Sequence, residues 1–387
     1  MRHEQLAETL KLVIKREEAK NPPRPDGWAS LERRLRREPW RRATIAVAAA
    51  CSVAVIIAIP ALLHVIGPSG PASKSLHGSP GELVVLGAAR LPGESARMAV
   101  GYGAVWIAGT GKTYEVDQVT DQLLRSITTP GTNRGGCQSG VAAGSGAVWV
   151  THDCRGVYRI DPVTGQVTAS ITVLRAADMI VAAHGLIWTA TLNGEIVRIN
   201  PKTGTVTGQP IPIGYDVLGR RAGAPPSIVG IVSGAGALWI DTSIGFVGRI
   251  DLATGRVASF KLGDVSAVGI GSAWVLGSEL IRTDLPPSSS VGIDATVNTR
   301  PLSANVSLWR GQVWVLAWVS TPHRALSVQR IDPADNNLHG DTLIPGSAPP
   351  ASASGPVSVT AGPTGLWVIE PSTAMLFHLG VNDAHQR

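Results

Sequence analysis

The sequence predicts an all-β fold, a seven-bladed β-propeller, preceded by one transmembrane α-helix and a short helical cytoplasmic tail. Three observations support this fold class. Residues 44–66 are apolar, a tryptophan motif recurs seven times after residue 100, and 44 glycines and 27 prolines in 387 residues are typical of a fold with many turns. The chain therefore divides into a tail (1–43), a transmembrane helix (44–66), a flexible linker (67–81) and the propeller (82–387).

The tail carries most of the net charge. It contains 12 Lys and Arg against 7 Asp and Glu, so that +5 of the chain's +6 lies in its first 43 residues. The rest of the chain is close to neutral, which disfavours nucleic acid as a partner of the propeller. Apolar residues at helical spacing predict a short amphipathic helix that ends before Pro22 and Pro23. These residues are Leu6, Leu10, Val13 and Ile14.

Residues 44–66 contain no Asp, Glu, Lys or Arg and are long enough to span a bilayer. At a rise of about 1.5 Å per residue, these 23 residues exceed the roughly 30 Å hydrocarbon core. The apolar region of a cleaved signal peptide is shorter, about 7–15 residues. The span is therefore interpreted as an uncleaved signal anchor that contacts the lipid bilayer. A cleaved signal peptide and a buried soluble helix are the alternatives.

The charges that flank this span predict its orientation. Six arginines crowd its N-terminal side: Arg33, Arg34, Arg36, Arg37, Arg41 and Arg42. Beyond the span, Lys74 is the only early cation, and residues 67–81 are rich in Gly, Pro and Ser. Positive charge favours the cytoplasmic side, so the expected localisation is the cell membrane, with the N-terminus inside and the propeller outside.

The tryptophan motif, an apolar residue, Trp and an apolar pair, occurs seven times. The tryptophans are Trp106, Trp149, Trp188, Trp239, Trp274, Trp314 and Trp367. Their mean spacing of about 43 residues matches a four-stranded propeller blade. A second element, such as YRIDPVTGQVTASI, follows the tryptophan and predicts strand, turn and strand, because Asp, Pro and Gly each favour the turn. The last unit lacks a fourth strand, which residues 82–91 are expected to supply, closing the ring.

The pattern W-V/I…R-I-D-P…T-G resembles the superfamily of YVTN, YncE and streptogramin-lyase-type propellers over residues 82–380. This resemblance implies the fold but not one function, because such propellers serve as sensors, scaffolds and occasional enzymes. The tail and span are similar to the N-terminal ends of actinobacterial membrane proteins, including anti-sigma factors. That similarity implies a sigma factor as cytoplasmic partner, although the tail has His3 and none of the cysteines of the zinc-binding type. A plain anchor with a weakly folded tail is the favoured interpretation, and sigma-factor binding is the alternative.

The order of the four strands of a blade, a to d from the axis outward, separates two faces. The a–b and c–d turns lie on one face, here named the turn face, and the d–a and b–c loops lie on the other, the loop face. Repeated motifs fall in the core or on the turn face, so they indicate folding, and binding is expected on the loop face. Its candidate binding residues are Arg134, His152, Asp153, Arg155, Asp216, Arg220, Arg221, Asp241, Glu279, His323 and Glu370. An ordinary solvated rim is the alternative.

Three cysteines are too few for a disulfide scaffold, and none has metal-site spacing. Cys51 lies in the apolar span. Cys137 and Cys154 are expected to lie opposite each other at the open end of a hairpin that turns near Ser145. In an oxidising space outside the cell they are predicted to form a disulfide.

Two functions from different classes fit these features. The first is a ligand- or protein-binding sensor module without catalysis. The second, implied by the resemblance, is a metal-dependent lyase of the streptogramin-lyase type, which needs a base and a divalent metal. His152, Asp241, Glu279 and Glu370 have the required chemistry, but no His-x-Glu-like catalytic pair aligns with this chain. We therefore assign no catalytic residue, no metal site and no cofactor.

Overall fold

The computed structural model describes the chain between Glu82 and Asn382, with internal gaps. The described ranges are 82–93, 95–109, 111–129, 140–152, 156–173, 176–213, 227–243, 245–261, 264–269, 271–276, 280–284, 295–297, 304–319, 325–347, 357–370 and 373–382. They all belong to the second of two compact units, Leu76–Arg387. The predicted tail, transmembrane helix and linker lie outside them. Within these ranges, no helix has the length and apolar character needed to cross a membrane.

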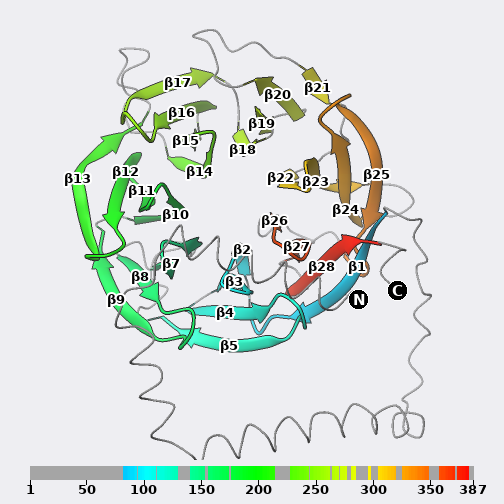
Figure 1. Ribbon diagram of the computed structural model, residues 1–387, viewed down its shortest axis with the longest axis horizontal. Helices are drawn as coiled ribbons and strands as arrows, with labels where there is room; N and C mark the ends of the chain where they lie inside the picture. The colour runs from blue at the N-terminus through cyan, green and yellow to red at the C-terminus, as the bar shows by residue number, and fades with distance from the viewer. Residues whose placement is uncertain are drawn as a thin grey trace, which may run out of the picture. The chain divides into compact units, whose positions relative to one another are not determined.

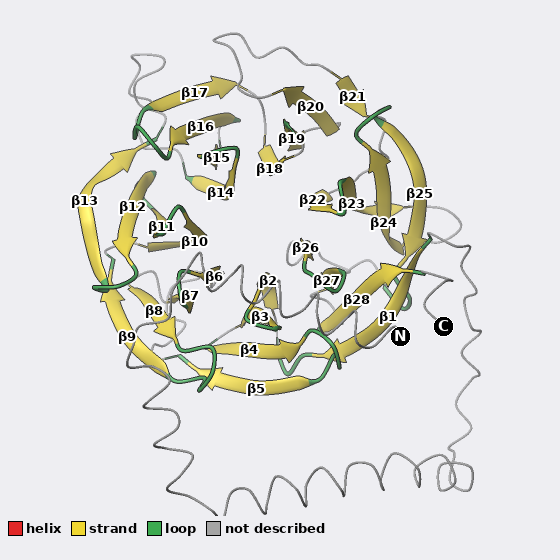
Figure 2. Ribbon diagram, in the orientation of Figure 1, coloured by secondary structure: helices red, strands yellow, loops and turns green. Residues whose placement is uncertain are grey.

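The described residues form 28 strands in seven four-stranded antiparallel sheets. The sheets are arranged as the blades of a ring, with one strand of each nearest the axis and one at the rim (Figure 1). Strands and their connecting loops account for this part of the chain (Figure 2). The prediction of an all-β propeller is therefore confirmed.

Blades are numbered in chain order, and the strands of each are given from the axis outward. Blade 1 contains β2 (Ser95–Gly101), β3 (Ala104–Gly109), β4 (Lys112–Asp117) and β5 (Leu123–Thr128). Blade 2 contains β6 (Val141–Gly144), β7 (Ala147–His152), β8 (Gly156–Ile160) and β9 (Val167–Thr172). Blade 3 contains β10 (Ala176–Ala183), β11 (Leu186–Thr191), β12 (Glu195–Asn200) and β13 (Thr205–Pro212). Blades 4 and 5 contain β14 (Ile228–Gly234), β15 (Ala237–Thr242), β16 (Phe246–Asp251), β17 (Val257–Lys261); and β18 (Asp264–Gly269), β19 (Ser272–Leu276), β20 (Leu280–Asp284), β21 (Ala295–Val297). Blades 6 and 7 contain β22 (Ala304–Trp309), β23 (Gln312–Val319), β24 (Ala325–Asp332), β25 (Asn337–Leu343); and β26 (Ser358–Ala361), β27 (Leu366–Glu370), β28 (Met375–Val381), β1 (Leu83–Arg90).

Two-residue turns join the first two strands of most blades. In blade 2, Gly144 pairs with Ala147, and the intervening Ser145 and Gly146 both have positive φ, 52° and 81°. Two successive positive φ values define a type I′ turn, whose twist matches that of the flanking strands. The same geometry occurs at residues 102–103, 184–185, 235–236 and 310–311. The glycine of each G-x-G-like element is therefore required by its backbone conformation.

The seven motif tryptophans are buried, with at most 4% of each exposed. In five blades the indole Nε1 donates a hydrogen bond to the carbonyl oxygen five residues earlier, at the end of the inner strand. In blade 2, for example, Trp149 bonds Gly144 at 3.0 Å, and in blade 1, Trp106 bonds Gly101 at 3.0 Å. Trp106 also belongs to one buried apolar cluster with Val141 and Val148 of blade 2. The interpretation of these tryptophans as core packing between blades is confirmed, since an indole ring buried in the core cannot stack on a ligand.

The N-terminal strand β1 closes the ring, as predicted. It pairs antiparallel with β28, from Leu83 opposite Val381 to Arg90 opposite Met375. Beyond the first pair, the amide of Asn382 donates to the carbonyl oxygen of Glu82 at 2.9 Å. The strand at the rim of blade 7 thus comes from the opposite end of the chain, and the ring is fastened by backbone hydrogen bonds.

Candidate functional site

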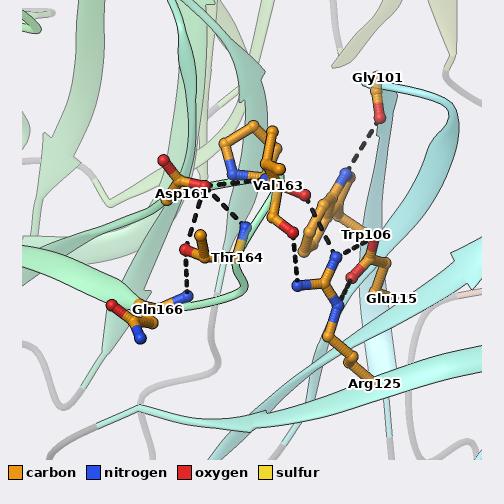
Figure 3. Close-up of polar contacts among 9 residues, drawn as sticks. Gly101, Trp106, Glu115, Arg125, Asp161, Val163, Thr164 and Gln166 are labelled. Atoms are coloured by element: carbon orange, nitrogen blue, oxygen red, sulfur yellow. Dashed lines mark hydrogen bonds and ion pairs between the residues drawn. The ribbon is translucent and has the colours of Figure 1, made fainter. Parts of the chain in front are cut away.

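The repeated aspartates of the turn face are occupied within their own turns. Asp161 Oδ1 accepts hydrogen bonds from the amides of Val163 and Thr164 at 2.9 and 2.8 Å and from the Thr164 hydroxyl at 3.1 Å (Figure 3). Asp117 and Asp251 make the same contacts in blades 1 and 4. Because these bonds favour the charged carboxylate, above all the bond from Thr164, they lower the pKa of Asp161 below its ordinary value of 3.8. The repeated aspartate is a turn former.

In blades 2 to 6 an arginine lies across from the motif tryptophan, and in blades 2, 4 and 5 it covers the ring. The guanidinium carbon of Arg159 lies 5.9 Å from the Trp149 ring centroid, and that of Arg249 lies 5.7 Å from Trp239. These arginines are the residues of the repeated R-I-D motif, which pair with the tryptophans across the two middle strands. The contact is a cation–π interaction within the blade. The repeated arginine therefore has a structural partner.

Blade 1 departs from this pattern, because Glu115 lies across from Trp106. Glu115 is 4% exposed, and its burial raises the pKa of its carboxyl, an effect that Arg125 opposes. Arg125 on β5 pairs with Glu115 at 2.6 Å from Nε to Oε2 and donates from Nη1 to the carbonyl oxygen of Val163 at 3.0 Å (Figure 3). A second bond from Nη2 reaches the carbonyl oxygen of Pro162 at 3.3 Å. Arg125 thus ties blade 1 to the c–d turn of blade 2.

Blades 5 and 6 are joined at the corresponding place by another arginine. Arg282, across from Trp274, donates from Nη1 to the carbonyl oxygen of Pro333 at 2.5 Å and to Asn336 Oδ1 at 3.2 Å. Pro333 and Asn336 belong to the c–d turn of blade 6. Among the described residues, the repeated polar groups of the turn face therefore serve turns, tryptophans and blade junctions.

On the loop face, the structure describes the side chains of two predicted binding residues. Asp241 ends close to Gly230 of the inner strand and is 4% exposed. Glu370 is 1% exposed, and its Oε2 accepts hydrogen bonds from the amide of Thr373 at 2.8 Å and from the Thr373 hydroxyl. Asp241 lies in blade 4 and Glu370 in blade 7, with two blades between them on the shorter way round. The two carboxylates are buried structural groups of separate blades, and the structure does not bring them into one site.

The side chains of the other predicted site residues are not among those that the structure describes. His152 is the last residue of β7, at the loop face, and its side chain lies outside the description. The remaining candidates lie outside the described residues altogether: Arg134, Cys137, Asp153, Cys154, Arg155, Asp216, Arg220, Arg221, Glu279 and His323. Among the residues whose positions are described, no group of three or more His, Cys, Asp and Glu is arranged to hold a metal ion. The predicted loop-face site and the disulfide stay predictions.

The polar residues at the blade junctions were not singled out in the sequence. Their signal is a departure from the repeat. Glu115 and His378 stand where other units have arginine, and Asp121 stands where other units have glycine in T-G. Substitutions of this kind mark positions where one unit makes a contact that its neighbours do not make.

The fold and its junctions define the protein as a β-propeller. A family model described as a repeat of unknown function (DUF6923) matches residues 117–224, from the c–d turn of blade 1 to the segment after blade 3. No curated protein sequence matches the chain. The finer resemblance to YncE-like and streptogramin-lyase-like propellers stays a prediction.

Solved structures with a similar fold share little sequence with this chain. The β-propeller domain of Cps50 (Swd1) from Myceliophteria thermophila superposes with a TM-score of 0.59 at 12% identity, covering 78% of this chain and 100% of that domain. The WD40 domain of Pan2 from Neurospora crassa gives 0.58 at 12% identity, covering 79% and 97%. BamB from Moraxella catarrhalis gives 0.52 at 11% identity, covering 79% and 100%. At such low identity the similarity shows the fold alone.

Proposed function

We propose that this protein is a membrane-anchored binding module that presents the loop face of an extracytoplasmic propeller to a protein or other ligand. Residues 44–66 hold it in the bilayer, and residues 1–43 remain in the cytoplasm. The observation that carries the proposal is the unequal use of the two faces. On the turn face, the repeated polar groups are bound to one another, whereas the loops of the opposite face vary from blade to blade in length and sequence.

The point where the chain enters the propeller supports the same choice of face. Glu82 lies beside Asn382, where other blades have their c–d turns, so the linker joins the propeller on the turn face. A flexible linker of 15 residues has a root-mean-square span of about 20 Å. In an anchored protein the turn face is thus the tethered one, and the loop face is the one free to meet a partner.

The near-neutral charge of residues 44–387 favours a protein or an uncharged ligand over a polyanion. A propeller suits protein binding because it holds many independent loops on one rigid framework. For the tail, we propose a plain anchor, with binding of a sigma factor, a cytoplasmic partner, as the alternative. Capture of a sigma factor by immobilised residues 1–43, and its loss when Leu6 and Leu10 are both changed to Asp, would support that partner.

Site-specific photo-crosslinking in the full chain, in its own membrane, tests the choice of face. A photoreactive residue is placed at Leu192 or Ser243, both exposed on the loop face, or at Val163 or Lys202, both exposed on the turn face. We expect a discrete adduct from the loop-face positions and none from the turn-face positions. Adducts from Val163 and Lys202 alone would contradict loop-face binding.

Two further measurements test the anchoring. The protein should stay with the membrane during alkaline extraction, and protease added outside intact spheroplasts should reach the propeller but not the tail. Release by alkali, or protection of the propeller from the added protease, would contradict the proposed topology.

A further inference from the structure

The c–d turns of blades 1, 2, 3, 4 and 6 share one backbone position in the left-handed region, four residues after the turn's first Asp or Asn. Glycine occupies this position in blades 2, 3 and 4, as Gly165, Gly204 and Gly255, with φ of 71°, 68° and 71°. In blade 1 the position is taken by Asp121, with φ of 59°, and in blade 6 by Asn336, with φ of 57°. Glycine adopts this conformation without a steric cost, whereas a residue with a Cβ does not. A non-glycine residue here calls for a separate reason.

The turn of blade 1 does not need the carboxylate of Asp121. Its amides are already satisfied by Asp117, whose Oδ1 accepts from Val119 and Thr120 at 2.8 Å each. The side chain of Asp121 instead leaves its own blade. Its Oδ1 lies 2.8 Å from Nδ1 of His378 on β28 of blade 7, a residue 257 positions away in the chain.

Blade 7 is shaped to receive this carboxylate. His378 lies between Trp367 and Gly87, its partners on the two neighbouring strands. Its ring stacks on Trp367 with centroids 4.0 Å apart and 8° between the planes. A Cβ at Gly87 would collide with the carboxylate of Asp121, and β1 has a register irregularity between Val85 and Gly87. The absent side chain and the irregularity make room for Asp121 over the ring-closing strand.

Asn336, the other non-glycine residue, also receives a side chain from the preceding blade. Its Oδ1 accepts from Arg282, which lies across from Trp274 of blade 5, as His378 lies across from Trp367 of blade 7. Where the turn has glycine, the residue paired with the motif tryptophan of the preceding blade makes its hydrogen bond within that preceding blade. Arg159 donates to Thr168, before the turn with Gly204, and Arg198 donates to the carbonyl oxygen of Gln209, before the turn with Gly255.

We infer that Asp121 and His378 form a latch that fastens blade 7 to blade 1, and that Asp121 occupies the left-handed turn position because of this contact. The latch joins the C-terminal strand β28 directly to blade 1. It therefore holds the closing junction of the ring independently of the hydrogen bonds between β1 and β28. Both partners are largely buried, with 5% of the His378 side chain and 17% of the Asp121 side chain exposed, so the contact is shielded from water.

Asp121→Gly separates this role from a local role in the turn. If Asp121 served only the turn, glycine would leave the protein as stable or more stable, because it relieves the backbone conformation. With the latch, Asp121→Gly should lower the protection of β1 and β28 against amide hydrogen exchange by about tenfold. Exchange in the strands of blade 4, which lies opposite the junction of blades 7 and 1 in the ring, is the internal reference.

His378→Phe and Asp121→Asn complete the test, all measured on the full chain in detergent. Phenylalanine keeps an aromatic ring on Trp367 but removes Nδ1, so this variant should lose protection at the same strands. The double variant should lose no more than the worse single variant. Asparagine keeps the oxygen acceptor and should stay close to the unmodified protein. Unchanged or increased protection of β1 and β28 in Asp121→Gly, or additive losses in the double variant, would overturn the inference.

Discussion

Trp367 and His378 lie face to face in blade 7, with ring centroids 4.0 Å apart, where blades 2, 4 and 5 place an arginine over the motif tryptophan. The position across from the motif tryptophan thus holds an imidazole in blade 7 and a guanidinium in blades 2, 4 and 5. What differs is where the second side chain goes next. Arg159 bonds Thr168 within its own blade, whereas Arg282 and His378 each reach the c–d turn of the next blade.

We expect Trp149→Ala to lower the free energy of unfolding by about 3–5 kcal/mol, because it removes a fully buried indole and leaves a cavity between blades. Urea unfolding followed by circular dichroism measures this. Val163→Ala, at an exposed turn position, is the control and should change the free energy by less than about 0.5 kcal/mol. Loss of ligand binding by Trp149→Ala with unchanged stability would show instead that the tryptophan is a ligand contact.

Gly165→Ala and Gly255→Ala form a matched pair at one turn position, each with φ of 71°. Both should lose about 1 kcal/mol from the backbone conformation. Only at Gly165 would the new Cβ lie 2.7 Å from Arg125 Nη1, whereas at Gly255 it would meet no atom within 4 Å. Gly165→Ala should therefore cost about 1 kcal/mol more in urea unfolding. Equal losses would mean that Arg125 does not hold the junction between blades 1 and 2.

Arg125→Ala should cost about 2–3 kcal/mol, because it leaves the buried Glu115 carboxylate without its ion pair. Changing both residues, as Glu115→Met with Arg125→Met, should recover part of this loss, since no buried charge is then left alone. Thermal and urea unfolding of the three proteins provide the comparison. A double variant that is less stable than Arg125→Ala would contradict the assignment of this pair as the main contact.

The turn aspartates should make stability depend on pH in acid. The hydrogen bonds from Thr164 and Val163 hold the pKa of Asp161 below 3.8, so the folded state binds its proton less readily than the unfolded state does. The resulting stabilisation is fully present above the ordinary value and is lost as the pH falls through the lowered one. Asp161→Asn keeps an acceptor without the charge and should show a smaller drop in urea midpoint between about pH 6 and pH 3.

Blade 3 offers the reverse change for the same test. Its turn has Asn200, whose Oδ1 accepts from Lys202 and Thr203 at 2.9 and 3.3 Å, as the aspartates of the other turns do. Asn200→Asp should therefore steepen the acid dependence that Asp161→Asn weakens. If the two changes alter the dependence in the same direction, the turn carboxylates are not its source.

The repeat was sufficient to predict the blades and their order. A few neighbouring residues specify each local feature of a blade, so these features could be inferred from spacing and turn chemistry. Examples in blade 2 are Trp149, the turn at Ser145 and Gly146, and the turn at Asp161. The closing strand was also predictable, because a unit lacking its fourth strand leaves an edge that residues 82–91 match. These features depend on local sequence and on counting, which a repeat makes reliable.

The candidate site was less predictable. Asp241 and Glu370 have the composition of site residues, but the structure buries them in separate blades, where Glu370 bonds Thr373. A sequence does not reveal whether a carboxylate at the end of a strand turns outward or inward, because this depends on the loops packed above it. The irregularity of those loops is also the reason that the repeat says little about them.

The sequence by itself determined the all-β repeat, the buried tryptophans, the turn formers and the strand that closes the ring, because each follows from residues close together in the chain. Only the tertiary structure decided which side chains join one blade to the next. Asp121 and His378 are 257 residues apart in the chain, and they meet because closure of the ring places the first and last blades side by side. The carboxylate of Asp121 then lies close to Gly87, which pairs with His378. Such a contact depends on distances across the whole assembly of blades, which no single repeat unit specifies.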